Sequence, residues 1–259
     1  MTESIQYQPG SPVGEIILNQ PSKRNAINAA MWRGLGEVVQ QAEADTAAKV
    51  LIIRGEGKHF AAGADITEFE KAYATRDSAA AYTQTMLAGL ETLARCTKPT
   101  IAMIRGACVG GGCSIALSCD FRFAGMSARM GVTPGKLGLV YALADTRRLT
   151  ATVGLSNAKD LLFTGRLVDV DEAHAMKLCD RVFAEEALHT ETLSFAQQIA
   201  ETSRWSIRAT KRTFDMLADG IPDTSDSAMA IMLESFGGED FREGYRAFLD
   251  KRKPKFPTK

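Results

Sequence analysis

The chain has 259 residues, 45% hydrophobic and 24% charged, which suits an ordinary globular protein of one large domain or two small ones. Lysine plus arginine equals aspartate plus glutamate, at 31 each, so no overall field attracts nucleic acid or an anionic membrane, and neither is expected as a partner. No apolar stretch has the length of a membrane span, and the first residues lack the pattern of a secretory signal.

The first half of the chain alternates strand and helix patterns. Strand patterns cover residues 13–18, 49–54, 100–105 and 121–124, and helical patterns cover 29–44 and 78–96. Asn28 is suited to cap the first helix, and Pro99 breaks the chain before the third strand. This order predicts an α/β fold with βαβ crossovers and a mostly parallel sheet.

From about residue 155 onward the pattern is helical. The predicted helices are 156–163, 171–178, 186–203, 207–218, 225–236 and 240–251. Their apolar stripes are interpreted as packing surfaces. Because no linker interrupts this part, we expect it to pack on the first part of the chain or on a partner subunit.

The cysteines and histidines indicate the redox state of the compartment and whether a metal site is expected. The cysteines are Cys96, Cys108, Cys113, Cys119 and Cys179, and the histidines are His59, His174 and His189. The cysteine number is odd and contains no Cys-x-x-Cys pair, which fits a reduced, cytoplasmic compartment. The scattered histidines show no zinc spacing, so no metal is expected.

A glycine-rich turn, Gly106–Ser114, lies between the strand at 100–105 and a helix predicted from Ile115. Its three consecutive glycines allow positive φ and close approach of a ligand to the backbone. The following helix directs free N–H groups and its positive dipole end at the turn. The turn is therefore a candidate for stabilising negative charge, although a single turn of this kind is also compatible with a plain connection.

A second glycine-rich turn, Phe60–Ile66, follows the strand at 49–54. In open α/β sheets, ligands bind beyond the carboxyl ends of the strands. Two such turns can place two N–H donors around one oxygen, the geometry that stabilises a thioester enolate.

With three further segments, these turns resemble the crotonase superfamily, whose best-known member is enoyl-CoA hydratase, over essentially the whole chain. The other segments are Pro21–Asn28, Leu161–Arg166 and Phe248–Phe256. The resemblance implies a core of ββα units in a spiral at residues 1–195 and a helical trimerisation region at 196–259. It also implies a homotrimer or dimer of trimers, an acyl-CoA substrate that itself carries the CoA, and no separate cofactor.

The resemblance further implies individual roles. The N–H groups of Ala64 and Gly111 would form the oxyanion hole. Lys23, Arg24 and Ala26 would lie near the adenine and phosphates of CoA, although a solvated pair is the alternative for the two cations. The other substrate contacts would be Ala62, Asp65, Ile66, Thr67, Gly110 and Pro134, with Phe248 and Lys251 supplied by a neighbouring subunit.

Hydratases of this family use two glutamates, and both positions differ in this chain. Ser114 occupies the first, and Pro134 occupies the second. Adding water needs a base and an acid within hydrogen-bond reach, which serine and proline do not supply. The sequence therefore disfavours hydration.

The remaining polar candidates are Ser114, Thr133 and Tyr141. The segment 133–141 resembles that of methylmalonyl-CoA decarboxylases, which differ in carrying histidine at the position of Ala64 and glutamate at that of Ser114. Decarboxylation of a malonyl-type thioester needs enolate stabilisation and neutral donors but no general base. We therefore expect decarboxylase- or isomerase-like chemistry, with Thr133 and Tyr141 as donors.

Alternatives remain for the protein and for its polar residues. The protein could be a hydratase with unusual residues, or a non-catalytic or RNA-binding relative; Arg33 is the only cation in 29–44, which argues against RNA. The structural alternatives are a core position for Tyr141, an in-helix bond for Ser114, a cap for Thr133, a surface position for His59, and anchoring for Asp65. Asp145 is interpreted first as a helix-start charge and second as an acid–base group.

Overall fold

In the computed structural model, which describes residues 4–256, the core is a six-stranded sheet of order β1-β2-β3-β4-β6-β8. The strands are β1 (Ile5–Gln8), β2 (Val13–Leu18), β3 (Val50–Gly55), β4 (Thr100–Ile104), β6 (Phe121–Gly125) and β8 (Arg181–Phe183). Only the β1–β2 pair of this sheet is antiparallel. A second, parallel pair of strands joins β5 (Ala107–Val109) to β7 (Arg129–Gly131).

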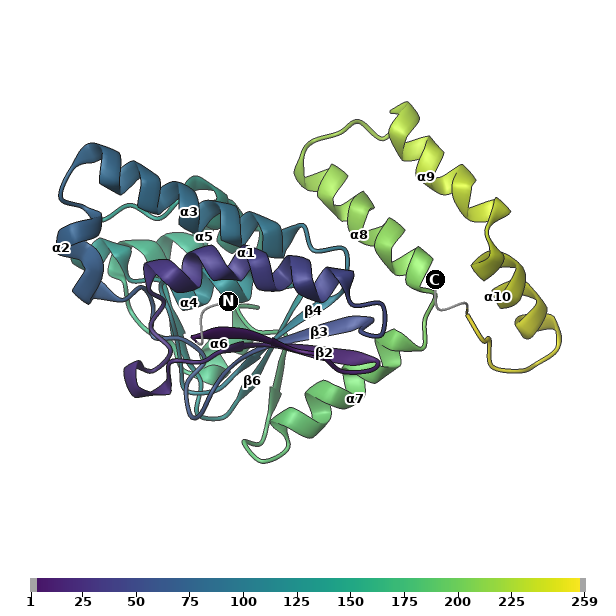
Figure 1. Cartoon of the computed structure of the whole chain (residues 1–259), viewed down its shortest axis with the longest axis horizontal. Coiled ribbons are helices and arrows are strands. Elements are labelled where there is room, and N and C mark those ends of the chain that lie inside the picture. The colour runs from purple at the N-terminus through teal and green to yellow at the C-terminus, as the bar shows by residue number, and fades with distance from the viewer. Residues whose placement is uncertain (1–3, 257–259) are drawn as a thin grey trace.

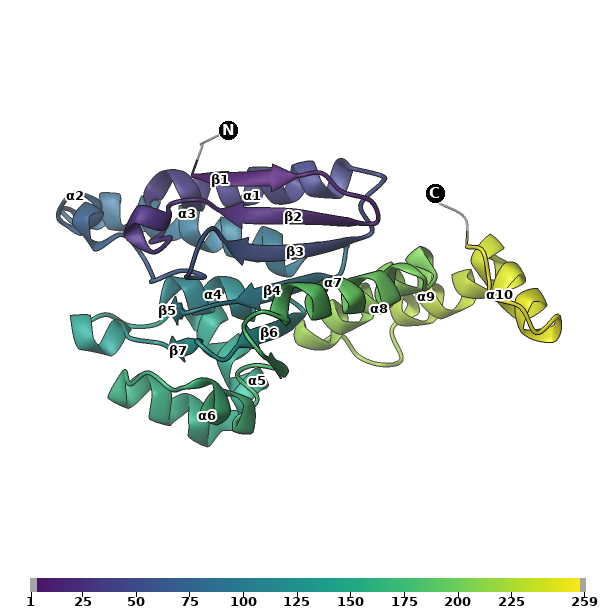
Figure 2. The ribbon, with the colours of Figure 1, turned by 90° about the horizontal axis from the view of Figure 1, so that it is seen from below.

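Helices cover both faces of the sheet (Figures 1 and 2). Helix α1 (Ala29–Ala44) packs against β1 and β2 and carries α3 (Arg76–Ala94) on its outer side, while α7 (Leu188–Ala200) crosses the opposite face. The other helices are α2 (Phe69–Ala72), α4 (Gly111–Leu117), α5 (Leu143–Thr164), α6 (Val170–Ala175), α8 (Arg204–Ala218), α9 (Asp226–Gly237) and α10 (Glu239–Leu249). No helix within residues 4–256 has the length and apolar character to cross a membrane.

Strand β3 shows why the central strands read as unbroken apolar runs. Leu51 and Ile53 join the core cluster under α1 and α3, whereas Val50 and Ile52 join the cluster under α7. Both faces of the strand are buried, so alternating side chains must all be apolar. The predicted parallel α/β architecture is thereby confirmed.

Several elements begin where the sequence predicts, and others were missed. Helix α1 has the predicted bounds, and the Asn28 side chain caps it by accepting a hydrogen bond from the Met31 amide at 2.8 Å. Strands β1, β5, β7 and β8 were not predicted, because each has only three or four residues and depends on pairing with a distant segment.

Two helix starts were predicted more than three residues too late. Helix α4 begins at Gly111 rather than Ile115, with Gly110 as its N-cap at a φ of 52°. Helix α5 begins at Leu143 rather than residue 156, with a kink at Gly154, where φ is 78°. The kink glycine and the glycine-rich N-terminus both weaken helix propensity, which concealed the true starts.

Helices α8, α9 and α10 extend away from the sheet (Figures 1 and 2). They expose large apolar side chains, including Phe214, Phe236 and Phe248. The predicted boundary at 195/196 falls inside α7, whose Ala196 packs against the sheet. The division into a core and a trimerisation region stays a prediction, and residues 1–3 of the first region and 257–259 of the second lie outside the described residues.

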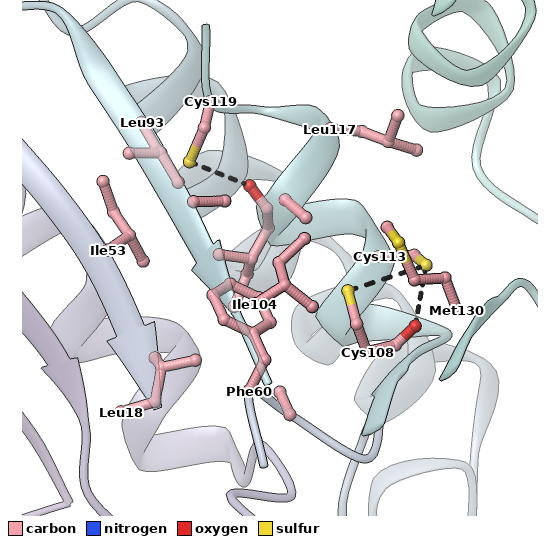
Figure 3. Close-up of a cluster of buried hydrophobic side chains, with 14 of the residues drawn as sticks. Leu18, Ile53, Phe60, Leu93, Ile104, Cys108, Cys113, Leu117, Cys119 and Met130 are labelled. Carbon is pink, nitrogen blue, oxygen red and sulfur yellow. Dashed lines mark hydrogen bonds between the residues drawn. The ribbon is translucent and has the colours of Figure 1, made fainter. Parts of the chain in front are cut away.

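The two glycine-rich turns are packed on each other through a small apolar cluster. Figure 3 shows Phe60 and Ile104 beside Cys108 and Cys113, with Met130 near the two sulfur atoms. At Gly112 a Cβ atom would lie 2.4 Å from the Ala61 oxygen and 2.9 Å from the Ala61 Cβ. The position therefore has no room for a side chain.

We expect Gly112→Ala to destabilise the protein by about 1–3 kcal/mol, because the added methyl group overpacks the contact with Ala61. Gly237→Ala is the control, since a Cβ there meets nothing within 4 Å, and its effect should stay within about 0.5 kcal/mol. Urea unfolding measures both. Equal unfolding midpoints for the two variants would contradict the packing argument.

Candidate active site

The two glycine-rich turns are joined by backbone hydrogen bonds. The Ala61 amide donates to the Ala107 oxygen at 2.9 Å, and the Val109 amide donates to the Ala61 oxygen at 3.0 Å. Immediately beyond these bonds, Gly63 and Gly110 have φ values of 111° and 52°, which residues other than glycine rarely adopt. The strand-like contact between the two turns therefore ends at these two glycines.

Two backbone amides just past the end of this contact have no acceptor within the described residues. Within residues 4–256, neither Ala64 N nor Gly111 N donates to a protein group. They lie close together, since a Cβ built on Gly111 would be 3.5 Å from Ala64 N. Such a pair of free, neighbouring N–H donors can stabilise one oxyanion.

Both amides belong to residues that line a cavity of about 170 Å³. Its lining includes the hydroxyl-bearing residues Ser114, Thr133 and Tyr141. The larger part of the wall is apolar and includes Trp32, Ile66, Phe69, Tyr73, Met86, Leu137, Leu139 and Val140. A cavity with an apolar wall and a few convergent polar groups is typical of a small-molecule site.

A chain of hydrogen bonds leads from this cavity into the protein. Ser114 Oγ lies 2.8 Å from the Tyr141 hydroxyl and 3.0 Å from Asp145 Oδ2. Arg148 Nη1 donates to Asp145 Oδ1 at 3.2 Å, and Arg148 Nη2 donates to Glu91 Oε2 at 2.5 Å. The chain links helices α3, α4 and α5 behind the cavity wall.

Burial raises the pKa values of two groups in this hydrogen-bonded series, Asp145 and Tyr141. Asp145 is 1% exposed, and its burial raises the pKa of the carboxyl group in spite of the Ser114 hydrogen bond and the Arg148 charge. Burial also raises the pKa of the Tyr141 phenol well above its usual range, and the neighbouring Asp145 adds to the shift. Tyr141 is therefore a neutral hydroxyl group at physiological pH.

Many of the residues predicted from the sequence lie together at this cavity. They are Ala62, Ala64, Ile66, Gly110, Gly111, Ser114, Thr133, Pro134 and Tyr141. Their roles toward a substrate stay predictions. Asp145 lies in the first turn of α5, as its helix-start interpretation expects, but it also lines the cavity.

The residues predicted near the CoA head group lie beside the first turn. Lys23 Nζ bonds to Asp65 Oδ2 at 2.6 Å, and Arg24 accepts a hydrogen bond from the Ala62 amide through its backbone oxygen. Asp65 also accepts from the amide and the hydroxyl group of Thr67. Asp65 is 5% exposed and acts as an anchor for this loop. Ala26 adjoins the anchored segment.

Phe248 and Lys251 lie far from the cavity, at the end of α10 (Figure 1). Phe248 is 83% exposed. The fold of one chain does not bring these residues to the site, so their predicted contact with CoA requires a neighbouring subunit.

His59, interpreted as a surface residue rather than a catalyst, is partly exposed and lies outside the cavity lining, and its Nδ1 accepts a hydrogen bond from the Ala107 amide at 3.1 Å. Two other structural interpretations need correction. Thr133 makes no capping hydrogen bond with its side chain. Ser114 Oγ lies farther from the Gly110 oxygen, at 3.5 Å, than from Tyr141 or Asp145, so the in-helix bond is not its principal contact.

Asn25 was missed in the sequence. It is fully buried at a φ of 54°, accepts from the Gln20 amide and donates to the Glu56 and His59 oxygens. Its position directly after the two cations Lys23 and Arg24 suggests an exposed loop, but a short amide side chain that tolerates left-handed backbone is well suited to this role.

The parallel sheet and the cavity beside the two glycine-rich turns define the chain as an α/β protein with a candidate small-molecule site. The family model described as Enoyl-CoA hydratase/isomerase matches residues 9–259, and the chain belongs to that family. The crotonase-superfamily resemblance is thereby confirmed.

Relatives match over the full length. A solved structure of an enoyl-CoA hydratase/isomerase family protein from Hyphomonas neptunium has 46% identity and a TM-score of 0.96, covering 99% of this chain and 98% of that one. A Rhizobium meliloti protein named as a probable enoyl-CoA hydratase is 35% identical over 98% of both chains. The crotonyl-CoA hydratase of Syntrophomonas wolfei is 32% identical over 99% of both. The crotonase fold is confirmed by these matches.

The Lys23–Asp65 pair makes a pH-dependent contribution to stability. The hydrogen bonds from Lys23 and Thr67 lower the pKa of Asp65 below its usual value. A carboxyl group whose pKa falls on folding stabilises the protein above its unfolded-state pKa, and this contribution is lost as the pH falls.

We therefore expect Asp65→Asn to lower the free energy of unfolding by about 1 kcal/mol at neutral pH, with the difference from wild type shrinking in acid. Urea unfolding at a series of pH values measures it. A difference that is constant with pH would show that the charge of Asp65 contributes nothing.

Proposed function

We propose that this protein acts on CoA thioesters and stabilises a thioester enolate with the N–H groups of Ala64 and Gly111. The observation that carries the proposal is the pair of neighbouring amides without a protein acceptor at one cavity wall. A negative oxygen placed there would gain two fixed donors without rearrangement of the backbone. The family's acyl-CoA chemistry supports the same substrate class.

The reaction that fits this cavity forms the enolate without adding water. Ser114 and Pro134 stand at the two positions where hydratases carry glutamates, and hydroxyl groups take the place of the acid–base pair. Departure of carbon dioxide or of a proton from the carbon next to the thioester needs the enolate to be stabilised, and neutral donors such as Tyr141 and Thr133 can orient the leaving group. We therefore propose decarboxylase- or isomerase-like activity.

Hydration is the second candidate, and two observations favour it. Asp145 contributes a carboxyl group to the cavity lining, although at neither glutamate position. The crotonyl-CoA hydratase of Syntrophomonas wolfei is among the relatives. A single carboxyl group that is buried and paired with Arg148 supplies one acid–base group rather than two.

We also propose a homotrimer or a dimer of trimers. The exposed apolar side chains of α8, α9 and α10, such as Phe236 and Leu249, support association. Association is also the route by which Phe248 and Lys251 of a neighbouring chain could reach a CoA molecule in this cavity.

A panel of CoA thioesters tests the reaction class. Crotonyl-, 3-enoyl-, methylmalonyl- and ethylmalonyl-CoA are each incubated with the enzyme and followed by mass. We expect turnover of a malonyl-type or 3-enoyl thioester. Crotonyl-CoA hydration should be about 10²–10⁴-fold slower than with a relative that carries both glutamates, assayed in parallel, because an acid–base group is missing. Hydration at the rate of that relative would overturn this assignment.

Tyr141→Phe tests the hydroxyl group on the cavity wall. The change keeps the ring and removes one hydrogen-bonding group, which contributes about 1.5–3 kcal/mol when its partner is charged. We expect a roughly 10- to 100-fold loss in kcat/KM and an unchanged melting temperature. A variant that melts earlier while keeping its turnover would place the hydroxyl group in the core instead.

A further inference from the structure

The hydroxyl groups of Ser114 and Tyr141 share a constraint that involves Asp145. Ser114 has one hydroxyl proton, and its oxygen lies within hydrogen-bond distance of both Tyr141 and Asp145. It can donate to only one of them. The protonation state of Asp145 therefore decides in which direction the hydrogen bonds between Asp145, Ser114 and Tyr141 are donated.

When Asp145 is ionised, it accepts the Ser114 proton, and Ser114 accepts the Tyr141 proton in turn. The Tyr141 oxygen then offers only lone pairs to the cavity. When Asp145 is protonated at Oδ2, it can donate to Ser114, Ser114 to Tyr141, and Tyr141 to the cavity. The same three groups thus present an acceptor in one state and a donor in the other.

We propose that Asp145 is the proton reservoir for the enolate, exchanging protons with the substrate carbon through Ser114 and Tyr141. The inference rests on the enolate function proposed above. On protonation, the Tyr141 O–H bond breaks and a C–H bond forms with the electron pair of the enolate. Tyr141 takes the Ser114 proton, Ser114 takes the Asp145 proton, and water reprotonates Asp145. The reverse sequence removes a proton from the carbon.

The surroundings of Asp145 suit a group that must hold both states. Its burial favours the neutral acid, whereas Arg148 from the same helix and the Ser114 hydroxyl group from α4 favour the carboxylate. Glu91 from α3 binds Arg148 at 2.5 Å and so offsets part of the arginine charge. Tyr141 faces it from the preceding loop as a neutral phenol. The pKa of Asp145 is raised overall by burial, and the Ser114 hydroxyl group and the Arg148 guanidinium group oppose that rise.

Asp145 acts through other residues, so it is a positioning residue, and its role is measured by hydrogen exchange. Butyryl-CoA, which has no leaving carboxylate, is incubated with the enzyme in D2O, and deuterium at the carbon next to the thioester is followed by mass and NMR. We expect wild type to exchange one of the two α-hydrogens. Because removal of an α-hydrogen needs ionised Asp145 as the final proton acceptor, the exchange rate should rise with pH across the Asp145 pKa.

Asp145→Asn should slow the exchange about 10²–10⁴-fold and abolish the pH step. Ser114→Ala keeps the Asp145–Arg148 pair and interrupts only the relay, so it should have a similar effect, and the double variant should be no slower than the slower single one. Asp160→Asn is the matched control. Asp160 lies on the same helix and pairs with Arg166, outside the cavity lining, so this change should leave the exchange unaltered.

The outcomes separate the two proposals. Exchange by wild type that persists at an equal rate, with the same pH step, in Asp145→Asn and Ser114→Ala would overturn the relay and leave the enolate function standing. A lower melting temperature with that unchanged exchange would make Asp145 a purely structural link between α4 and α5. Absence of exchange by wild type would overturn the relay alone, because loss of carbon dioxide from a malonyl-type thioester forms the enolate without proton removal, and the thioester panel decides the enolate function separately.

Discussion

The site depends on the backbone hydrogen bonds that flank Ala64 and Gly111. The neighbouring backbone groups have partners within the chain, whereas the Ala64 and Gly111 amides have none within the described residues. The Ile27 amide donates to the Gly63 oxygen, and the Asp65 amide donates to the Ile27 oxygen, so the chain is fixed on both sides of Ala64. Gly110 is held likewise by the Gly131 oxygen. Ala64 and Gly111 are both partly exposed and line the cavity, so an acceptor from outside the chain can reach the two N–H groups.

The glycines explain why this arrangement can exist. Gly63 and Gly110 adopt positive φ, and Gly112 packs against Ala61 at a distance that excludes any side chain. The cost is conformational entropy in the unfolded chain, which the surrounding cluster of Phe60, Cys108 and Cys113 offsets by burial. The same packing that brings the turns together therefore also holds the amides rigidly, and rigidity makes such donors effective.

Local patterns predicted the four central strands β2, β3, β4 and β6, helix α1 and the two glycine-rich turns, because these features are encoded by neighbouring residues. Asn28 caps its own helix, and the run from Val50 to Ile53 identifies a strand buried on both faces. The role of Asp145 could not be read in this way. Its partner Ser114 lies 31 residues away, and Arg148 reaches Glu91 across 57 residues. Nothing local to Asp145 distinguishes a helix-start charge from a carboxyl group at a cavity.

Asn25 illustrates the same limit for a structural residue, since its partners Glu56 and His59 belong to another segment. The chemistry of the cavity follows from a comparable long-range relation. Asp145 is 1% exposed, and its carboxyl group bonds to Ser114 Oγ at 3.0 Å. In the proposed relay it exchanges protons with a substrate through the Ser114 and Tyr141 hydroxyl groups, whereas a carboxylate fully open to the cavity could activate water directly. The proposed relay therefore favours reactions in which the carbon next to the thioester gains or loses a proton over reactions in which water attacks.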